Sequence, residues 1–198
     1  MCAWYNMKGD YMHIVFGGSF NPPTKGHFQI MKQLVSHFEH AKLIVVPVGN
    51  DYQKNDLQPF LHRYNMLKLM LDNIDNIIVS DIEAHRAYQG TLKTLDDLSN
   101  TYDDLYFVIG ADNLIDLPNW INYKTLLASY PFIVMHREGH MTEAEAETMF
   151  KDLKHHFLFI DFHSPSKSSH VRDNIHAFRE YLCDEVYEYI KKHHLYGV

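Results

Sequence analysis

Cysteine is scarce in this chain, with two residues, Cys2 and Cys183, among 198. Two cysteines at opposite ends of the sequence do not make the disulfide framework of a small secreted domain. They also fall short of the closely spaced thiolates of a structural zinc site. The sequence therefore argues against a disulfide scaffold and against a cysteine-rich metal domain.

An excess of basic residues is also missing. The chain has 18 lysines and arginines against 25 aspartates and glutamates, a formal net charge of −7. A charge of this sign does not attract a nucleic-acid backbone, although a local positive cleft can still hold a small phosphate-bearing ligand. We therefore expect a small phosphorylated partner and no nucleic acid.

Long hydrophobic runs are absent, and the start, MCAWYNMKGDYM, lacks the apolar core of a signal peptide. We therefore expect a cytoplasmic protein with no membrane partner. Residues 1–11 read as an N-terminal extension, and Met1, Met7 or Met12 could each be the native start. Residues 12–198 are expected to form a single domain, because a chain that is 46% hydrophobic can close one core of this size. The oligomeric state stays open, and a homo-oligomer is compatible with these features.

Short apolar runs alternate with segments of helical spacing, which is typical of βα units around a parallel sheet. Strands are predicted at 12–17, 43–48, 77–81, 105–110, 132–136 and 156–162, and helices at 26–38, 60–74, 90–100, 123–129 and 142–156, with two more in 168–195. The pattern predicts an α/β fold with a doubly wound, mostly parallel, Rossmann-like sheet and a C-terminal helical segment. Ligands of such sheets bind beyond the carboxyl ends of the strands, so the segments that follow the strands are the candidate site.

The turn GGSFNPPTKGH, at 17–27, follows the first predicted strand and suits a phosphate cradle. Gly17 and Gly18 let the main chain approach a ligand closely. Thr24 is a plausible N-cap, which puts Gly26 and His27 in the first turn of a helix, where N–H groups favour an anion. The spacing matches neither GxGxxG nor the P-loop, and a plain tight turn with an ordinary histidine explains the pattern about equally well.

A second polar segment, SPSKSSHVRDNI, lies near the other end of the chain, at 164–175. Ser168 or Ser169 can cap a helix, and Arg172 offers a guanidinium fork that suits phosphate. Alone, this segment reads more simply as a helix cap with a surface arginine. Together with the first turn, it suggests two helix N-termini that converge on one polyphosphate.

These segments resemble paired signatures of a known superfamily. GGSFNPPTKGH is similar to the GxFxPxHxGH signature of adenylyltransferases of the HIGH-type nucleotidyltransferases, and SKSSHVR is similar to ISSTxxR. The order and spacing of VPVGNDYQK, HRYNML, TLKTL, FVIGADNLIDLPNW, FIVMHREG and DEVYEYIKKHHLY resemble the bacterial nicotinate-nucleotide adenylyltransferases, from residue 12 to residue 196.

The resemblance implies transfer of AMP from ATP to the phosphate of nicotinate mononucleotide, with release of pyrophosphate, as a step of NAD biosynthesis. A phosphomonoester is largely ionised at neutral pH, so such an acceptor needs no general base. Catalysis then consists of aligning two anions and stabilising charge on the phosphoryl oxygens. The implied cofactor is Mg²⁺, held mainly by the ATP phosphates and not by a protein metal site.

The resemblance also implies the roles of individual residues. His27 would donate to the α-phosphate, and Arg172 would hold the departing pyrophosphate. The implied ATP-binding residues are Gly17, Gly18, Ser19, Phe20, Thr24, Gly26, Lys54, Ser168 and Ser169. The implied mononucleotide and ribose residues are Thr91, Gly110, Asp112, Trp120 and Arg137. Simpler readings remain open for some of them: a solubilising Lys54, a turn at Asp112 and a core position for Trp120.

Two departures from the family pattern bear on this interpretation. Thr24 stands where the family has its first histidine, and QGTLKTL stands where it has SYTxDTL, near the pyridine pocket. The second departure leaves the preference for an acid or an amide mononucleotide open.

Other functions also fit parts of the sequence. The acceptor could be nicotinamide mononucleotide or phosphopantetheine, or the protein could be a non-catalytic nucleotide-binding regulator. A tRNA-handling protein is disfavoured by the acidic charge. Zinc chemistry at His136 and His140 is disfavoured because HREGH lacks the HExxH arrangement.

Overall fold

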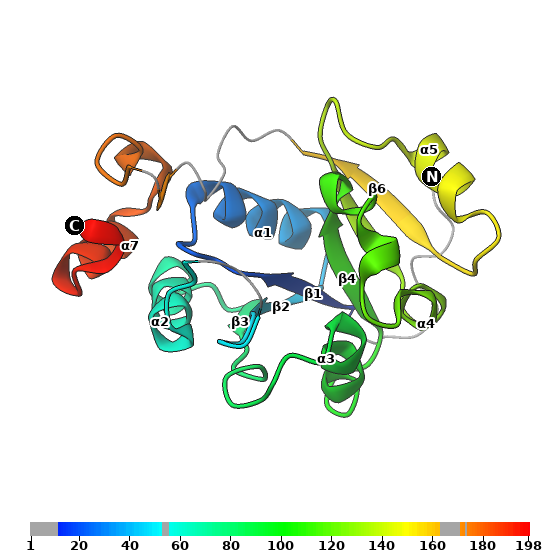
Figure 1. The fold of residues 1–198 in the computed structure, drawn as a ribbon, viewed down its shortest axis with the longest axis horizontal. Helices are drawn as coiled ribbons and strands as arrows, with labels where there is room; N and C mark the ends of the chain where they lie inside the picture. The colour runs from blue at the N-terminus through cyan, green and yellow to red at the C-terminus, as the bar shows by residue number, and fades with distance from the viewer. Residues whose placement is uncertain (1–11, 53–55, 163–170, 173) are drawn as a thin grey trace.

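A computed structural model describes residues 12–52, 56–162, 171–172 and 174–198 of the chain. Its centre is a six-stranded sheet in the order β3-β2-β1-β4-β5-β6, in which every neighbouring pair is parallel (Figure 1). The strands are β1 (His13–Gly18), β2 (Lys42–Pro47), β3 (Ile77–Val79), β4 (Leu105–Gly110), β5 (Phe132–His136) and β6 (Phe157–Asp161). The predicted doubly wound α/β fold is confirmed, and each strand lies within a residue or two of its predicted position.

Helices lie on both sides of this sheet (Figure 1). They are α1 (Lys25–His37), α2 (Phe60–Met70), α3 (Thr91–Leu98), α4 (Tyr123–Ser129), α5 (Glu143–Phe150) and α7 (Asp184–Lys192). Short 3₁₀ turns are η1 (Ala111–Asn113), η2 (Leu117–Asn119), η3 (Arg179–Tyr181) and η4 (Leu195–Gly197). No helix of the described residues is long and apolar enough to cross a membrane.

The strands are apolar along their whole length because each face of the sheet has its own core. Ile14 of β1 packs into a cluster with residues of α1, α2 and α7, whereas its neighbour Val15 packs into a second cluster with residues of α3, α4 and α5. Successive side chains of a strand point to opposite faces, so both must be apolar when both faces are covered. This double burial holds the strand ends, and the turns that follow them, in fixed positions.

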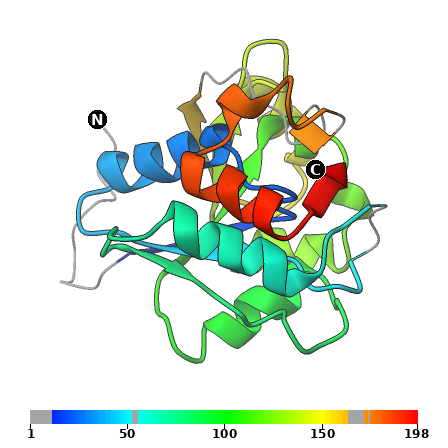
Figure 2. The same ribbon diagram turned by 90° about the vertical axis from the view of Figure 1, so that its left-hand side faces the viewer.

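The C-terminal part of the chain returns to the first half of the sheet. Helix α7 packs against α2, and the last turn, η4, follows it (Figure 2). The predicted C-terminal helical segment is therefore present. The predicted helix start at Ser168 and Ser169 lies outside the described residues, as do the extension at 1–11 and Lys54.

Candidate active site

A cleft of about 470 Å³ opens at the carboxyl ends of β1 and β4. The strand order reverses between these two strands, since β2 and β3 follow on one side and β5 and β6 on the other. A doubly wound sheet binds its ligands at this point of reversal. Six of the residues singled out in the sequence line the cleft: Gly17, Gly18, Ser19, Thr91, Gly110 and Trp120.

The turn after β1 is fixed by Phe20, which is 1% exposed and has a positive φ of 44°. Its ring packs edge to face against Phe16 at 5.4 Å and against the imidazole of His27 at 5.1 Å. The aromatic side chain therefore anchors the base of the turn in the core and packs against the ring of the histidine.

Thr24 caps α1 and orients His27. The main-chain N–H of Thr24 donates to Nδ1 of His27 at 3.0 Å, and the Thr24 hydroxyl lies 3.0 Å from the same nitrogen. Because Nδ1 accepts this hydrogen bond, the proton of the neutral imidazole is on Nε2, which makes Nε2 a donor. The predicted N-cap is confirmed. Thr24 stands where the family signature has its first histidine, and its hydroxyl helps to hold His27, the second histidine of that signature, in place.

Arg172 lies beside the same turn, although it is far away in the sequence. Its Nη1 donates to the main-chain oxygen of Asn21 at 2.9 Å. Asn21 is fully buried and precedes Thr24 by three residues. The structure therefore brings the guanidinium of the second polar segment to the turn that leads to His27.

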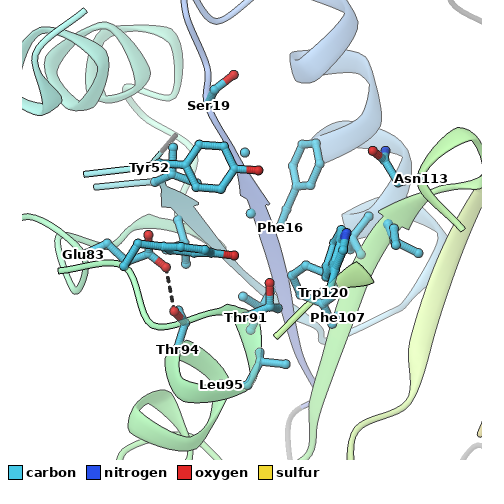
Figure 3. Close-up of a pocket in the computed structure, with 18 of the residues that line it drawn as sticks. Phe16, Ser19, Tyr52, Glu83, Thr91, Thr94, Leu95, Phe107, Asn113 and Trp120 are labelled. Atoms are coloured by element: carbon cyan, nitrogen blue, oxygen red, sulfur yellow. Dashed lines mark hydrogen bonds between the residues drawn. The ribbon is translucent and has the colours of Figure 1, made fainter. Parts of the chain in front are cut away.

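Aromatic side chains form the walls of the cleft away from this turn. Tyr52 and Tyr88 pack edge to face at 4.9 Å, and Trp120 packs edge to face on Phe107 at 6.2 Å. In the close-up, Tyr52 and Trp120 lie on opposite sides of the cleft, with Thr91 between them (Figure 3). Burial raises the pKa of the Tyr88 hydroxyl, which stays protonated at neutral pH. A flat ring fits between such walls.

Glu83 is a buried carboxylate that lines the cleft (Figure 3). It accepts hydrogen bonds from the N–H of Gly49 at 3.1 Å and from the hydroxyl of Thr94 at 2.6 Å. Arg86 in turn donates to the Thr94 hydroxyl at 2.9 Å and bonds to Asp97. The group joins the end of β2 to α3. The sequence reasoning missed it, and the one available signal was a carboxylate and an arginine in DIEAHR, directly after a strand.

Arg63 of α2 is a second buried group that the sequence reasoning missed, and it is fully buried. Its guanidinium donates to the main-chain oxygens of Ser19, Val48 and Gln58 at 2.9, 2.7 and 2.7 Å. Desolvation lowers the pKa of Arg63 to about 10, so the group still carries its charge at neutral pH. It ties the turns after β1 and β2 to the start of α2.

Asp112 and Arg137 are not among the described residues that line the cleft. The Asp112 carboxylate folds back over Gly110, where a Cβ would lie 2.3 Å from Oδ1, so a side chain at position 110 would displace this carboxylate. The Arg137 guanidinium lies over the ring of Phe162, 5.3 Å from its centre. Both residues follow the carboxyl ends of strands, as predicted, but they lie beside the cleft and not in its wall.

Histidines and acids do not form a metal site in the part of the chain that the structure describes, where no three His, Cys, Asp or Glu side chains are grouped for one. His136 is hydrogen-bonded through Nδ1 to Asp161 at 2.9 Å.

A parallel sheet of this order, with a glycine-rich turn, a helix N-terminus and a cleft at its point of reversal, defines a nucleotide-binding α/β domain. Residues 15–174 match a protein family described as "Cytidylyltransferase-like". A protein of Acholeplasma laidlawii named "probable nicotinate-nucleotide adenylyltransferase" is 37% identical over 186 residues, which cover 93% of this chain and 97% of the relative. A Sulfurovum protein of the same name is 32% identical over 161 residues, with 80% and 82% of the two chains covered.

Among solved structures, the Plasmodium falciparum nicotinic acid mononucleotide adenylyltransferase complexed with NaAD is similar to this chain with a TM-score of 0.78. It is 25% identical, and the match covers 94% of this chain and 97% of that one. The chain belongs to the nicotinate-nucleotide adenylyltransferases within the cytidylyltransferase-like family, which confirms the resemblance found in the sequence.

Proposed function

We propose that this protein transfers AMP from ATP to the phosphate of nicotinate mononucleotide, forming deamido-NAD and pyrophosphate for NAD biosynthesis. The observation that carries this proposal is the placement of Arg172 at the turn that leads to His27, beside a cleft with aromatic walls. The groups proposed to bind phosphate therefore lie at one side of the cleft, and aromatic surfaces that suit a flat ring lie at the other. Family membership supports the same reaction.

The reaction needs charge stabilisation more than proton transfer. The acceptor phosphate has its second pKa near 6, so its attacking oxygen is largely ionised at neutral pH. It attacks the α-phosphorus of ATP, and the bond from that phosphorus to the bridging oxygen of the pyrophosphate breaks. Negative charge grows on the oxygens in flight, and donors held in place before the reaction stabilise it.

In this scheme His27 donates from Nε2 to an α-phosphate oxygen, at the position that Thr24 and Phe20 fix. Main-chain N–H groups at Gly17, Gly18 and Ser19 and the start of α1 at Gly26 face the phosphates. Arg172, with Ser168, Ser169 and Lys54, holds the pyrophosphate. Mg²⁺ would be held by the phosphates of ATP and would neutralise part of their negative charge.

The aromatic part of the cleft is the proposed place for the pyridine ring of the mononucleotide. Trp120 stacks on the ring from one side, and Tyr52 and Tyr88 close the other side. Thr91 presents the N-terminus of α3, where the helix dipole favours a carboxylate. Asp112 and Arg137, beside the cleft, are proposed to contact the ribose.

One observation favours a second acceptor, the amide mononucleotide. Glu83 is the one charged side chain among the described residues that line the cleft, and its negative charge disfavours a second carboxylate nearby. Phosphopantetheine lacks a flat ring for the aromatic walls.

A cytoplasmic location and the absence of nucleic-acid partners belong to the same proposal, and a homo-oligomer stays a prediction.

Pyrophosphate release from ATP and Mg²⁺ tests the proposal when three acceptors are run in parallel: nicotinate mononucleotide, its amide and phosphopantetheine. We expect the highest kcat/KM with the acid, a lower value with the amide and no release above the acceptor-free control with phosphopantetheine. A higher kcat/KM with the amide than with the acid would show that the negative charge of Glu83 decides which acceptor the cleft prefers. Release with none of the three would indicate a non-catalytic nucleotide-binding protein.

A further inference from the structure

Tyr196 lies two residues before the last residue of the chain, in η4, yet it reaches the turn after β1. Its hydroxyl donates to Oδ1 of Asn21 at 2.7 Å. Burial raises the pKa of this hydroxyl far above its ordinary value, so it keeps its proton and remains a donor at any working pH. The end of the chain therefore supplies one hydrogen bond to the phosphate-binding turn.

Asn21 is the point at which four segments meet. Its Oδ1 also accepts from the N–H of Gln58 at 3.2 Å, and its Nδ2 donates to the main-chain oxygen of Asp56 at 2.8 Å. These three hydrogen bonds fix the amide of a side chain that has no exposed surface. The main-chain oxygen of the same residue accepts the hydrogen bond from Arg172 at 2.9 Å. The hydrogen bonds that fix Asn21 therefore also fix the main-chain oxygen to which the Arg172 guanidinium donates.

We propose that Tyr196 is a positioning residue of the ATP site, which holds Asn21 and, through the main-chain oxygen of Asn21, sets the place of the Arg172 guanidinium. The inference rests on the proposed function, in which Arg172 binds the pyrophosphate of ATP. Tyr196 itself touches no substrate in this scheme.

The chemistry of a neutral hydroxyl suits this position. Tyr196 lies within electrostatic range of both Arg63 and Arg172, and both lower its pKa against the effect of burial. A carboxylate at this point would fix Asn21 less well, because it has no proton to donate, and would neutralise the positive charge that a triphosphate requires. A phenol donates its hydrogen bond and leaves the charge of both guanidinium groups in place.

The hydrogen bond from Tyr196 to Asn21 depends on the packing of α7 against α2. Val186 and Ile190 of α7 are fully buried, and the Tyr189 hydroxyl accepts a hydrogen bond from Nδ2 of Asn65 in α2 at 3.1 Å. Nδ1 of His62 lies 3.1 Å from the same hydroxyl. Tyr189 thus attaches the C-terminal segment to α2 without touching the phosphate-binding turn, which makes it a matched control.

The first test compares Tyr196→Phe with Tyr189→Phe, since each removes one hydroxyl from the same segment. For Tyr196→Phe we expect kcat/KM for ATP to fall about tenfold, the kinetic equivalent of one buried hydrogen bond, with the KM for the mononucleotide within about twofold of its original value. Tyr189→Phe should leave kcat/KM for ATP unchanged. Thermal unfolding of both variants separates these effects from loss of folded protein.

The second test places Tyr196→Phe in an Arg172→Ala background. If Tyr196 acts through Arg172, the second substitution adds little to the loss caused by the first, because residues that act in series are not additive. Where turnover of Arg172→Ala is too slow to measure, the Kd for ATP from calorimetry completes the same cycle.

Three results would overturn the inference: normal ATP kinetics in Tyr196→Phe, an equal loss in Tyr189→Phe, or a full tenfold loss in the Arg172→Ala background. Each of them leaves the proposed reaction intact, provided the unsubstituted protein forms the dinucleotide. Absence of dinucleotide formation by the unsubstituted protein would instead overturn the proposed function.

Discussion

In the proposed reaction, the chemistry of the site depends most on His27. Its ring is held at Nδ1 by the N–H of Thr24 and packs against the ring of Phe20, so the remaining ring nitrogen points in a fixed direction. A donor that is fixed before the reaction loses no further entropy as charge develops. The imidazole is part of the helix cap, and in the proposed reaction it is also a catalytic donor.

We predict that His27→Ala lowers kcat by about 10²- to 10³-fold, the usual cost of removing one fixed donor. Because Nδ1 also caps α1, the free energy of unfolding should fall by about 1 kcal/mol, a loss that leaves the protein folded. Pyrophosphate release and urea unfolding measure the two effects.

His37→Ala is the matched control for this substitution, since His37 lies at the exposed end of the same helix. It should change neither quantity. A His27→Ala protein that retained the original kcat would show that the imidazole has no part in the reaction.

At the residue scale, the sequence predicted those residues of the candidate site that lie together in a short motif. Gly17, Thr24 and His27 lie in one short stretch of the chain, 17–27, so their proximity follows from the chain itself. Arg63 and Glu83 could not be found in this way, because their partners belong to turns that only the folded sheet brings together.

At the scale of elements, Glu83 joins the strand ends to the helix that forms the acceptor side of the cleft. One carboxylate accepts from Gly49 after β2 and from Thr94 in α3. A Cβ at Gly49 would lie 2.7 Å from the main-chain oxygen of Glu83, so a glycine is required for this close approach. The position of α3, and of Thr91 at its start, depends on this contact.

We predict that Glu83→Ala lowers the free energy of unfolding by about 1–3 kcal/mol, because the Gly49 N–H and the Thr94 hydroxyl lose their acceptor. The KM for the mononucleotide should rise, whereas the KM for ATP should change little. Glu83→Gln keeps one acceptor oxygen and should recover part of both effects. Steady-state kinetics and urea unfolding provide the measurements.

Glu39→Ala serves as the control for this prediction, since Glu39 is exposed just after α1. Equal increases of both KM values in Glu83→Ala would contradict a role confined to the acceptor side.

The order and type of the elements were predictable, because strands that are buried on both faces of the sheet appear in the sequence as continuous apolar runs. The ends of the helices were less predictable. Apolar spacing continues past Met70, yet α2 stops there, and the helix expected over 142–156 ends at Phe150. Apolar periodicity reports which residues face the core, and it continues through a turn that packs on the same core.

For the molecule as a whole, the two ends of the described chain meet at the site. Asn21 follows the first strand, and Tyr196 and Arg172 come from the last thirty or so residues, yet they are joined by hydrogen bonds of 2.7 and 2.9 Å. Contacts of such long sequence separation carry a loop-closure cost, which the folding of the segments between them offsets. Folding and assembly of the ATP site are therefore coupled.

This coupling gives a prediction for pH dependence. The folded pKa of Tyr196 is raised above its ordinary value of 10.0, so its contribution to stability is fully present below pH 10 and is lost as the pH rises further. The difference in unfolding free energy between the original protein and Tyr196→Phe should shrink above pH 10, by up to about 1.4 kcal/mol per pH unit. Arg63 titrates in the same range but is present in both proteins.

Urea unfolding of the two proteins from pH 8 to pH 11 measures this difference. A difference that stayed constant over the whole range would mean that the Tyr196 hydroxyl is not buried in the folded protein.

In the proposed reaction, this cleft transfers the AMP part of ATP and not a terminal phosphate. Incubation with nicotinate mononucleotide, Mg²⁺ and ATP labelled at its α-phosphate, followed by separation of the products, tests it directly. We predict that the label passes into deamido-NAD, with one unlabelled pyrophosphate released for each dinucleotide formed. Label that remained in ADP or AMP, with no labelled dinucleotide, would contradict the account.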